Sequence, residues 1–250
     1  IVGVSGGTDS SYLVYLAKEW GLRTLAVHYD HTWNSAIATM NIHKVLSGLG
    51  VDLYTHVVAN KEADDIFRAF FLAGVAEIEA ATDLGYAYLL RKVAAKYSIK
   101  HILEGHSFVE EGITPLGRNY FDGRYIQAIH QQFGRQPLET YPLMTFARFL
   151  QSAIFHQIKF IRPLWYLKYS KREAQTFLAN QFGWRYYGGH HLENRMTAFY
   201  HSVYLPKKFG GDMRNNTLAA QVRNGTRSRA DAWNEYNTPP YVEEELVSYF

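Results

Sequence analysis

The residues best suited to chemistry stand at the start of the chain, where a glycine pair is followed by hydroxyl and acidic side chains. Directly after the apolar residues 1–4, residues 5–11 read Ser-Gly-Gly-Thr-Asp-Ser-Ser. A glycine turn between a strand and a helix N-terminus presents free backbone N–H groups and the positive end of the helix dipole, which attract anions. Hydroxyl groups can donate hydrogen bonds to phosphate oxygens, and a carboxylate can hold Mg²⁺ or position the turn. The segment therefore predicts a phosphate-binding loop. Its members are Ser5, Gly6, Gly7, Thr8, Asp9, Ser10 and Ser11.

Polar residues also follow two other apolar runs. His28 and Asp30 end the second run, and Gly105 and His106 follow the run at residues 101–103. Ligands of open α/β sheets bind at the carboxyl ends of the strands, so these residues are expected to converge on the loop. A lone histidine is more often structural or at the surface, but the position of His106 at a strand end favours a functional role.

The elements that must position these residues alternate between short apolar runs and amphipathic stretches. Strands are predicted at residues 1–4, 24–29, 52–58 and 101–103. Helices are predicted at residues 10–20, 36–49, 66–72, 86–97 and 171–181, with two short ones between 216 and 236. Strands that alternate with helices indicate an α/β fold with a doubly wound parallel sheet.

The composition changes after about residue 112. Gly, Pro, Arg and Tyr crowd into residues 114–125, and a long aromatic stretch follows at 146–169. We expect residues 1–112 to form the nucleotide-binding α/β core. Residues 113–250 are expected to form a helical, aromatic-rich region that binds substrate and partner and packs on the core.

Bulk composition excludes several classes of protein. The 250 residues are 47% hydrophobic and 20% charged, which is typical of a folded globular chain. The net charge of +3 suits phosphorylated ligands but is too small for an extended nucleic-acid surface, so no nucleic-acid partner is expected. The absence of cysteine excludes disulfides, thiolate zinc sites and cysteine nucleophiles within these residues. No apolar run approaches the roughly 20 residues of a membrane span, and a cytoplasmic location is expected. Since residue 1 already lies in a predicted strand, we expect the natural polypeptide to begin upstream.

The string Ser-Gly-Gly-x-Asp-Ser after an initial strand resembles the PP-loop of the ATP pyrophosphatases. That group includes NAD, GMP and argininosuccinate synthetases and tRNA-modifying enzymes such as lysidine synthases. The resemblance implies an adenine nucleotide alpha hydrolase-like fold, ATP and Mg²⁺ as cofactors, and transfer of AMP to a carbonyl or carboxylate oxygen. The loop would bind the pyrophosphate of ATP, and the end of the second strand would meet the adenosine.

The resemblance extends over nearly the whole chain to the N-acetyl sugar amidotransferases of bacterial surface-polysaccharide (lipopolysaccharide O-antigen) biosynthesis. It is carried by residues 25–28, 33–35, 50–56, 79–83, 105–108, 115–117, 122–126, 182–184, 187–195 and 204–210. The implied reaction uses ATP and ammonia to convert the acetamido group of a nucleotide-linked N-acetylated sugar, a uronic acid, into an acetamidino group. Ammonia would come from a separate glutaminase and cyclase-barrel pair resembling imidazole glycerol phosphate synthase.

The two resemblances together assign roles to individual residues. Catalytic roles are expected for Asp9, Asp83 and His106, with Asp9 and Asp83 also holding the metal. ATP contacts are expected from residues 5–11, His28, Asp30 and Gly105. Substrate contacts are expected from Asp122, Arg124, His190, His191, Glu193 and Arg195. Plainer interpretations exist for two of these: Thr82-Asp83 could simply cap a helix, and Asp122 could simply form a turn.

Thr8 departs from the family pattern, because family members often carry lysine at this position and a phosphate-facing cation is then missing here. Relatives also often carry a cysteine cluster near the N-terminus, for which this chain has no counterpart. Two other functions stay open. One is a PP-loop enzyme that modifies tRNA, which the small net charge and, for a thiolase, the absence of cysteine oppose. The other is a non-catalytic module that binds a nucleotide without turnover.

Overall fold

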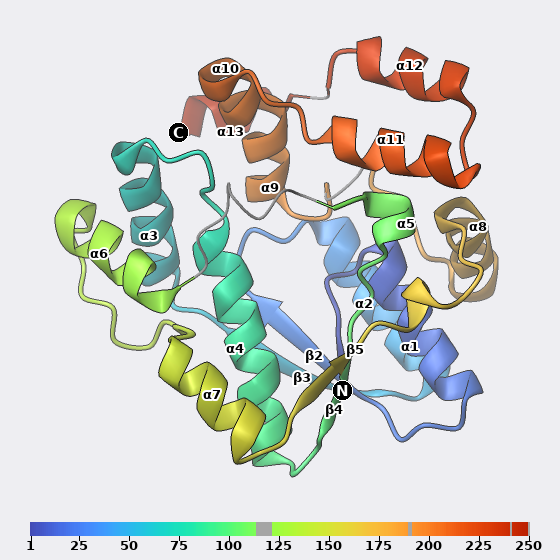
Figure 1. Ribbon diagram of the computed structural model, residues 1–250, viewed down its shortest axis with the longest axis horizontal. Helices are drawn as coiled ribbons and strands as arrows, with labels where there is room; N and C mark the ends of the chain where they lie inside the picture. The colour runs from blue at the N-terminus through green and yellow to red at the C-terminus, as the bar shows by residue number, and fades with distance from the viewer. Residues whose placement is uncertain (114–121, 190–191, 241, 250) are drawn as a thin grey trace.

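A parallel sheet forms the centre of the molecule (Figure 1). The computed structural model describes residues 1–113, 122–189, 192–240 and 242–249. Within them the strands lie in the order β3-β2-β1-β4-β5, and each pairs in parallel with its neighbour. Their bounds are Val2–Gly3 (β1), Leu25–Asp30 (β2), Asp52–Val57 (β3), His101–Leu103 (β4) and Lys159–Ile161 (β5). The predicted α/β fold class is confirmed, and the strand order reverses beside β1, the strand that leads into the glycine turn.

One face of the sheet is covered by α1 (Thr8–Glu19) and α2 (Ala36–Leu49), with α8 (Lys171–Phe182) outside them. Leu13 and Ile42 bury their side chains against β1 and β2, and each such side chain contributes about 1.5–3 kcal/mol relative to exposure. Helix α2 has the predicted bounds and ends at Gly50, whose φ of 59° is a left-handed C-cap that glycine adopts without strain. Helix α1 begins two residues earlier than predicted, so its first turn belongs to the glycine-rich loop.

The other face carries α3 (Asn60–Ala73) and α4 (Ala80–Lys96), flanked by α6 (Gly123–Phe133) and α7 (Phe146–Ile154). Both α3 and α4 begin six residues before their predicted starts, at 66 and 86. The first turn of α3 contains the buried polar residue Glu62, which apolar periodicity does not predict. The carboxylate of Glu62 accepts hydrogen bonds from the backbone N–H groups of residues 140 and 141.

The C-terminal half adds the last strand and most of a helical layer above the carboxyl ends of the strands (Figure 1). Strand β5 lies beyond residue 112 and pairs with β4, so the central sheet draws on both halves of the chain. The layer consists of α5 (Phe108–Glu111), α9 (Arg195–Phe199), η3 (Tyr200–Tyr204), α10 (Leu205–Phe209), α11 (Arg214–Asn224), α12 (Arg229–Asn237) and α13 (Glu244–Tyr249). A short turn of 3₁₀ helix, η2 (Pro163–Trp165), follows β5.

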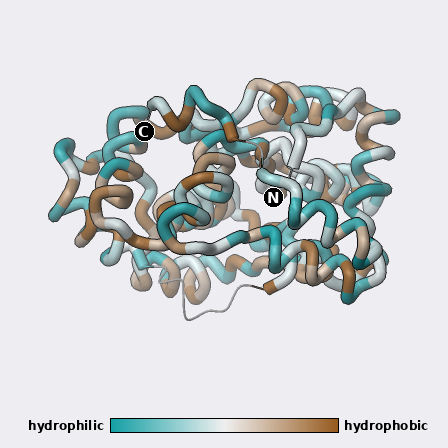
Figure 2. The backbone as a smooth tube through the Cα atoms, turned by 90° about the horizontal axis from the view of Figure 1, so that it is seen from above, coloured by the Kyte–Doolittle hydropathy of each residue, from teal (hydrophilic) through white to brown (hydrophobic). Residues whose placement is uncertain are grey.

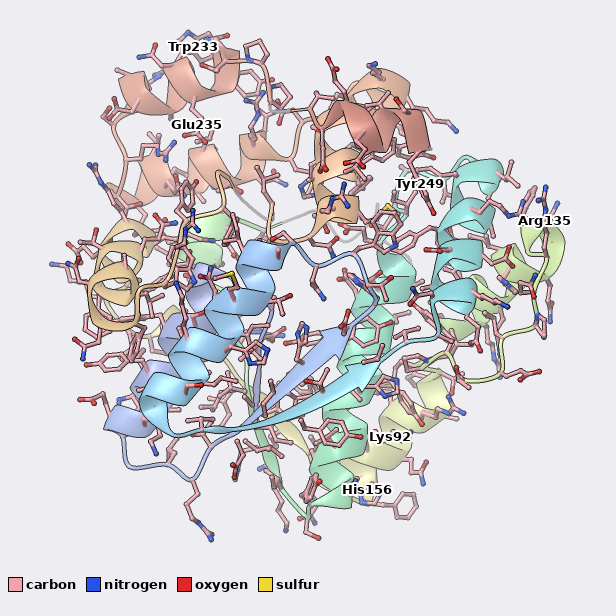
Figure 3. All side chains as sticks on the ribbon, turned by 180° about the vertical axis from the view of Figure 1, so that it is seen from behind. Lys92, Arg135, His156, Trp233, Glu235 and Tyr249 are labelled. Atoms are coloured by element: carbon pink, nitrogen blue, oxygen red, sulfur yellow. The ribbon has the colours of Figure 1, made fainter. Side chains whose placement is uncertain are left out.

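The labelled side chains of the outer helices point in different directions. In α12, Trp233 points away from the molecule while Glu235 points toward α11, and Tyr249 lies between α13 and α3 (Figure 3). Lys92 and His156 mark the opposite end of the molecule. Hydrophilic and hydrophobic residues alternate along the helices (Figure 2), and no helix in the described ranges has the length and apolar character needed to cross a membrane.

Candidate functional site

The glycine turn is fixed by contacts of Gly6 with α2 and by hydrogen bonds to the Gly6 carbonyl group. Gly6 has a φ of 83°, and a Cβ atom there would lie 2.3 Å from the carbonyl oxygen of Ala38 in α2. Its own carbonyl oxygen accepts hydrogen bonds from Trp184 Nε1 at 3.1 Å and from Asn41 Nδ2 at 3.4 Å. Gly7 is the extended N-cap of α1 and has no side chain to cap the helix. The N–H groups of the first turn of α1 are therefore not used by a capping side chain, which is the arrangement that binds anions.

The hydroxyl groups of the loop divide into two kinds. Ser5 is exposed, and its Oγ lies 3.5 Å from Ser10 Oγ and accepts a hydrogen bond from Gly7 N at 3.3 Å. Thr8 and Ser11 are buried in the first turns of α1, and Thr8 accepts a hydrogen bond from Gln175 in α8. Ser5 and Ser10 can therefore reach a ligand as the structure stands. The ATP contacts predicted for Thr8 and Ser11 remain predictions, with their hydroxyls turned into the protein.

Asp9 is the centre of a charged network. Tyr169 donates a 2.5 Å hydrogen bond to its Oδ1, and Lys171 Nζ lies 2.7 Å from its Oδ2. The same Lys171 Nζ lies 3.4 Å from Glu111 Oε1, and His106 Nε2 lies 3.6 Å from Glu111 Oε2. A continuous set of polar contacts thus joins two of the predicted catalytic residues, Asp9 and His106.

The network fixes the charges of its members. Burial acts to lower the pKa of Lys171, but the charges of Asp9 and Glu111 outweigh it and hold this pKa well above its ordinary value. Burial, followed by the Asp9 charge, raises the pKa of Tyr169. Lys171 is therefore a cation and Tyr169 a neutral donor throughout the physiological pH range.

The ends of the neighbouring strands meet the loop, as expected. Gly105, after β4, lies so close to the first turn of α1 that a Cβ atom would be 3.1 Å from the backbone of Asp9. At the end of β2, His28 is buried, with Nδ1 2.9 Å from the Val4 carbonyl and Nε2 3.4 Å from Asn34. Asp30 accepts hydrogen bonds from the same Asn34 side chain and from the backbone N–H of residue 32. Both His28 and Asp30 are thus engaged within the protein, and their ATP contacts remain predictions.

Glu193 reaches the loop from the C-terminal half. Its Oε1 accepts a hydrogen bond from Ser5 Oγ at 3.4 Å and would lie 2.9 Å from a Cβ atom on Gly7, with the Tyr187 hydroxyl beside it. Its backbone carbonyl accepts a hydrogen bond from Ser35 N at 2.8 Å. Of the residues predicted to bind substrate, Glu193 is thus in direct contact with the predicted phosphate-binding loop.

Asp83 lies in the first turn of α4, which points to the carboxyl edge of the sheet. Tyr86, one turn further along, lies against Gly3 of β1, where a Cβ atom would fall 1.7 Å from its hydroxyl. Burial and the negative charge of Asp83 together raise the pKa of Glu77 to about 7. The interpretation of Thr82-Asp83 as an N-cap pair is wrong, because the N-cap residue is Glu79 and both residues already lie inside the helix.

The remaining predicted substrate residues are spread out. Asp122 caps α6 by accepting a hydrogen bond from Arg124 N at 2.9 Å, and Arg124 is exposed. Arg195 Nε donates to Glu243 at 3.1 Å, and its Nη2 lies 3.3 Å from Glu245. His190 and His191 lie outside the described residues.

No group of three or more His, Asp or Glu side chains that could hold a metal occurs in the ranges described above. The single carboxylate of Asp9 at the loop suits a Mg²⁺ ion bound mainly by phosphate oxygens, since Mg²⁺ at nucleotide sites takes one or two carboxylates and several other oxygens. Asp9 lies at the turn where such an ion would accompany a triphosphate. Metal binding by Asp9 and by Asp83 remains a prediction.

Sequence reasoning missed several residues that contact the loop or its network, among them Glu111, Tyr169, Lys171 and Tyr187. The sequence did predict a helix starting at Lys171 after Ser170, and Ser170 is indeed the N-cap. It did not indicate that the start of this helix contacts Asp9, which lies 162 residues earlier in the chain. The aromatic stretch that contains Tyr169 carried no site assignment.

Comparisons with known proteins bear on both halves. Residues 193–250 match the family model described as LPS biosynthesis protein WbpG-like, C-terminal domain. A 67-residue stretch is 34% identical to a tRNA(Ile)-lysidine synthase of Chlamydia pneumoniae, covering 26% of this chain and 21% of that protein. The chain thus matches about a fifth of the length of that synthase. Over the matched residues these similarities support the predicted resemblance to PP-loop enzymes and to proteins of lipopolysaccharide biosynthesis.

Two solved structures share a weaker likeness. One is a predicted subunit of a tRNA methyltransferase from Methanocaldococcus jannaschii, with 13% identity, a TM-score of 0.39, and coverage of 71% of this chain and 74% of that one. The other is the U34-tRNA thiolase NcsA from Methanococcus maripaludis, with 14% identity, a TM-score of 0.40, and coverage of 89% and 71%. Likeness of this degree carries no information about function.

Proposed function

We propose that this protein is an ATP-dependent amidotransferase that converts the acetamido group of a nucleotide-linked N-acetylated sugar into an acetamidino group, with release of AMP and pyrophosphate. The sugar is proposed to be a uronic acid destined for a bacterial surface polysaccharide. The observation that carries the proposal is the contact of Glu193 with Ser5 and Gly7. Glu193 is the first residue of the segment that matches the WbpG-like domain, so the polysaccharide-type segment and the phosphate-binding loop share one site.

The proposed chemistry answers a specific difficulty. An amide carbon is a poor electrophile because its oxygen is a poor leaving group. In the first step the acetamido oxygen attacks the α-phosphorus of ATP, a new P–O bond forms, and the bond to pyrophosphate breaks. In the second step ammonia forms a C–N bond to the activated carbon, the C–O bond breaks, and AMP leaves with the oxygen. One amide, one ATP and one ammonia thus give one amidine, one AMP and one pyrophosphate.

The residues of the loop would perform the first step by holding the leaving group. The N-terminal turn of α1 and the hydroxyls of Ser5 and Ser10 would bind the pyrophosphate, which stabilises the charge that develops as the P–O bond breaks. Bound with the triphosphate, Mg²⁺ would supply further charge neutralisation, with Asp9 as its protein ligand. Adenosine contacts are assigned to His28 and Asp30 at the end of β2.

The second step requires removal of a proton from the incoming nitrogen. We assign this proton to His106, at the end of β4, which Glu111 orients at 3.6 Å. Ammonia is proposed to come from a separate glutaminase and cyclase-barrel pair, because free ammonia is mostly protonated at neutral pH. Asp83, Asp122, Arg124, His190, His191 and Arg195 are retained as proposed substrate or metal contacts.

The decisive experiment incubates the full chain with ATP, Mg²⁺, an ammonium salt and a panel of UDP-linked diacetamido sugars. Pyrophosphate is measured, and mass spectrometry looks for replacement of one oxygen by NH in the sugar. We expect product with at least one sugar and its loss in Asp9→Asn. The exposed Lys168→Met serves as the matched control. The proposal would be refuted if none of the sugars in the panel changed the rate of pyrophosphate release.

A second candidate function is modification of tRNA by the same adenylation chemistry, and the match to a lysidine synthase favours it. The same pyrophosphate assay separates the two. A tRNA-modifying enzyme would release pyrophosphate when tRNA is added and would not respond to the nucleotide sugars. A module that only binds nucleotide would respond to neither.

A further inference from the structure

The phosphate-binding loop carries no positive side chain of its own. Asp9 is the one charged residue among residues 5–11, and it is negative. Glu193 adds a second carboxylate beside Ser5 and Gly7. The pyrophosphate end of ATP bears several negative charges, whereas a helix N-terminus supplies only about half a positive charge. A cation from elsewhere in the chain is therefore needed for the loop to hold a triphosphate.

We infer that Lys171 is this cation and that it binds the pyrophosphate end of ATP. The inference rests on the proposed function. Lys171 Nζ lies 2.7 Å from Asp9 Oδ2, in the first turn of α1, and its side chain is 15% exposed. Burial and the charge of Glu193 raise the pKa of Tyr187, whose hydroxyl lies beside Gly7, and the positive charge of Lys171 opposes that rise. The ammonium group thus stands at the turn that would receive the phosphates.

Lys171 is fixed in place rather than being a freely moving surface lysine. It is the first residue of α8, and Ser170 Oγ caps that helix by accepting a hydrogen bond from Glu173 N at 3.4 Å. Gln175, one turn later, donates to Thr8 Oγ1 at 3.2 Å. The residue before the cap, Tyr169, donates to Asp9. Together with the Lys171–Asp9 ion pair, the bonds of Tyr169 and Gln175 hold the start of α8 against the start of α1.

A purely structural role explains these features less well. The hydrogen bonds of Tyr169 and Gln175 and the aromatic packing of Tyr12 on Tyr169, with centroids 5.8 Å apart, already attach α8 to α1. Buried ion pairs add little net stability, because desolvation offsets much of the attraction. What Lys171 adds at this edge of the sheet is charge. An ammonium group has three donors on a flexible stem, so it can keep Asp9 as a partner while it contacts a phosphate oxygen.

The test compares ligands that differ in their phosphates. Binding of ATP, AMP and inorganic pyrophosphate to the full chain is measured with Mg²⁺ for the wild type, Lys171→Met, Lys171→Gln and Lys171→Arg. We expect Lys171→Met and Lys171→Gln to weaken ATP and pyrophosphate by about tenfold or more, as for loss of a charge-assisted hydrogen bond. AMP binding should change less than about twofold by the same reasoning, and Lys171→Arg should retain most of the affinity. Lys168→Met, three residues earlier and exposed, is the matched control, and melting temperatures verify folding.

Two results with the Lys171 variants would overturn the inference alone. Equal weakening of ATP, AMP and pyrophosphate would mean that Lys171 only maintains the shape of the loop, and unchanged affinities would mean that it does not touch phosphate. Either result leaves the proposed amidotransferase standing if the wild type binds ATP and modifies a sugar. A wild-type chain that binds neither ATP nor pyrophosphate would overturn the inference together with the proposed function.

Discussion

The carboxylate of Glu193 lies where it should oppose a phosphate, and this can be tested directly. Its Oε1 is 3.4 Å from the Ser5 hydroxyl and lies over Gly7, and the side chain is 7% exposed. Glu193→Gln keeps the shape and an oxygen that can accept from Ser5, but removes the charge. Two unit charges about 4 Å apart interact by about 4 kcal/mol at an effective dielectric constant of about 20. Allowing for relaxation and screening, we expect pyrophosphate without Mg²⁺ to bind at least about tenfold more tightly to the variant, which corresponds to about 1.4 kcal/mol.

The assay is titration calorimetry with pyrophosphate, with and without Mg²⁺, at constant ionic strength. In the presence of Mg²⁺ the gain should shrink, since a cation between the two anions removes their repulsion. Glu235→Gln, on α12, is the control for a general change in net charge. Unchanged or weaker binding of Mg²⁺-free pyrophosphate in Glu193→Gln would refute the reasoning, because the carboxylate would then not face the phosphate site.

Three further predictions concern the scaffold. Gly6→Ala should lower the free energy of unfolding by at least about 2 kcal/mol, because the alanine would be strained at a left-handed φ and would contact a backbone carbonyl of α2. Gly21→Ala, equally left-handed but in open space, should cost only about 1 kcal/mol, and thermal melting compares the two variants. The pKa of Glu77 is about 7 in the folded chain, compared with its ordinary value of 4.5 in the unfolded chain. The free energy of unfolding should therefore fall by roughly 1–3 kcal/mol as pH rises between these two values and level off above them. Glu77→Gln should remove this pH dependence in denaturant titrations. If the Arg195–Glu243 pair is structural, Arg195→Met and Glu243→Gln should each cost less than about 1 kcal/mol and affect sugar binding alike, and a loss of sugar affinity confined to Arg195→Met would instead support substrate contact.

Local patterns in the sequence predicted those helices and strands whose polar residues are exposed and whose apolar residues are buried. Helix α2 begins after the Ser35 cap and ends before Gly50, both of which are visible as residue types, and its bounds were predicted correctly. The start of α3 was missed because periodicity places a charged residue such as Glu62 at the surface. In the structure Glu62 is only 7% exposed, and its carboxylate accepts hydrogen bonds from the backbone at residues 140 and 141. Strand β5 was missed because two of its three residues are exposed, one is half-buried, and all three lie in an aromatic stretch without a clear apolar run.

The candidate site could be predicted only where the chain itself brings residues together. The glycine loop and the strand ends at Gly105 and His106 follow from the rule that parallel strands present their carboxyl ends at one edge. The contacts of Lys171 and Glu193 with this loop depend on how α8 and the segment after it return across α1 and α2. Such contacts join residues more than 150 positions apart, and no residue type or spacing in one sequence encodes them.

These long-range contacts make the loop a joint product of both halves of the chain. Trp184 binds the carbonyl of Gly6, Lys171 binds the carboxylate of Asp9, and Glu193 binds the hydroxyl of Ser5. The first fixes the direction in which the turn presents its N–H groups, and the other two set the charge around them. Glu193 begins the segment that matches a polysaccharide-type domain. If that segment binds the proposed acceptor sugar, a movement of Glu193 on binding changes the electrostatic surroundings of the turn. Nucleotide binding and acceptor binding are therefore expected to be energetically coupled through this carboxylate, and by linkage the coupling acts equally in both directions.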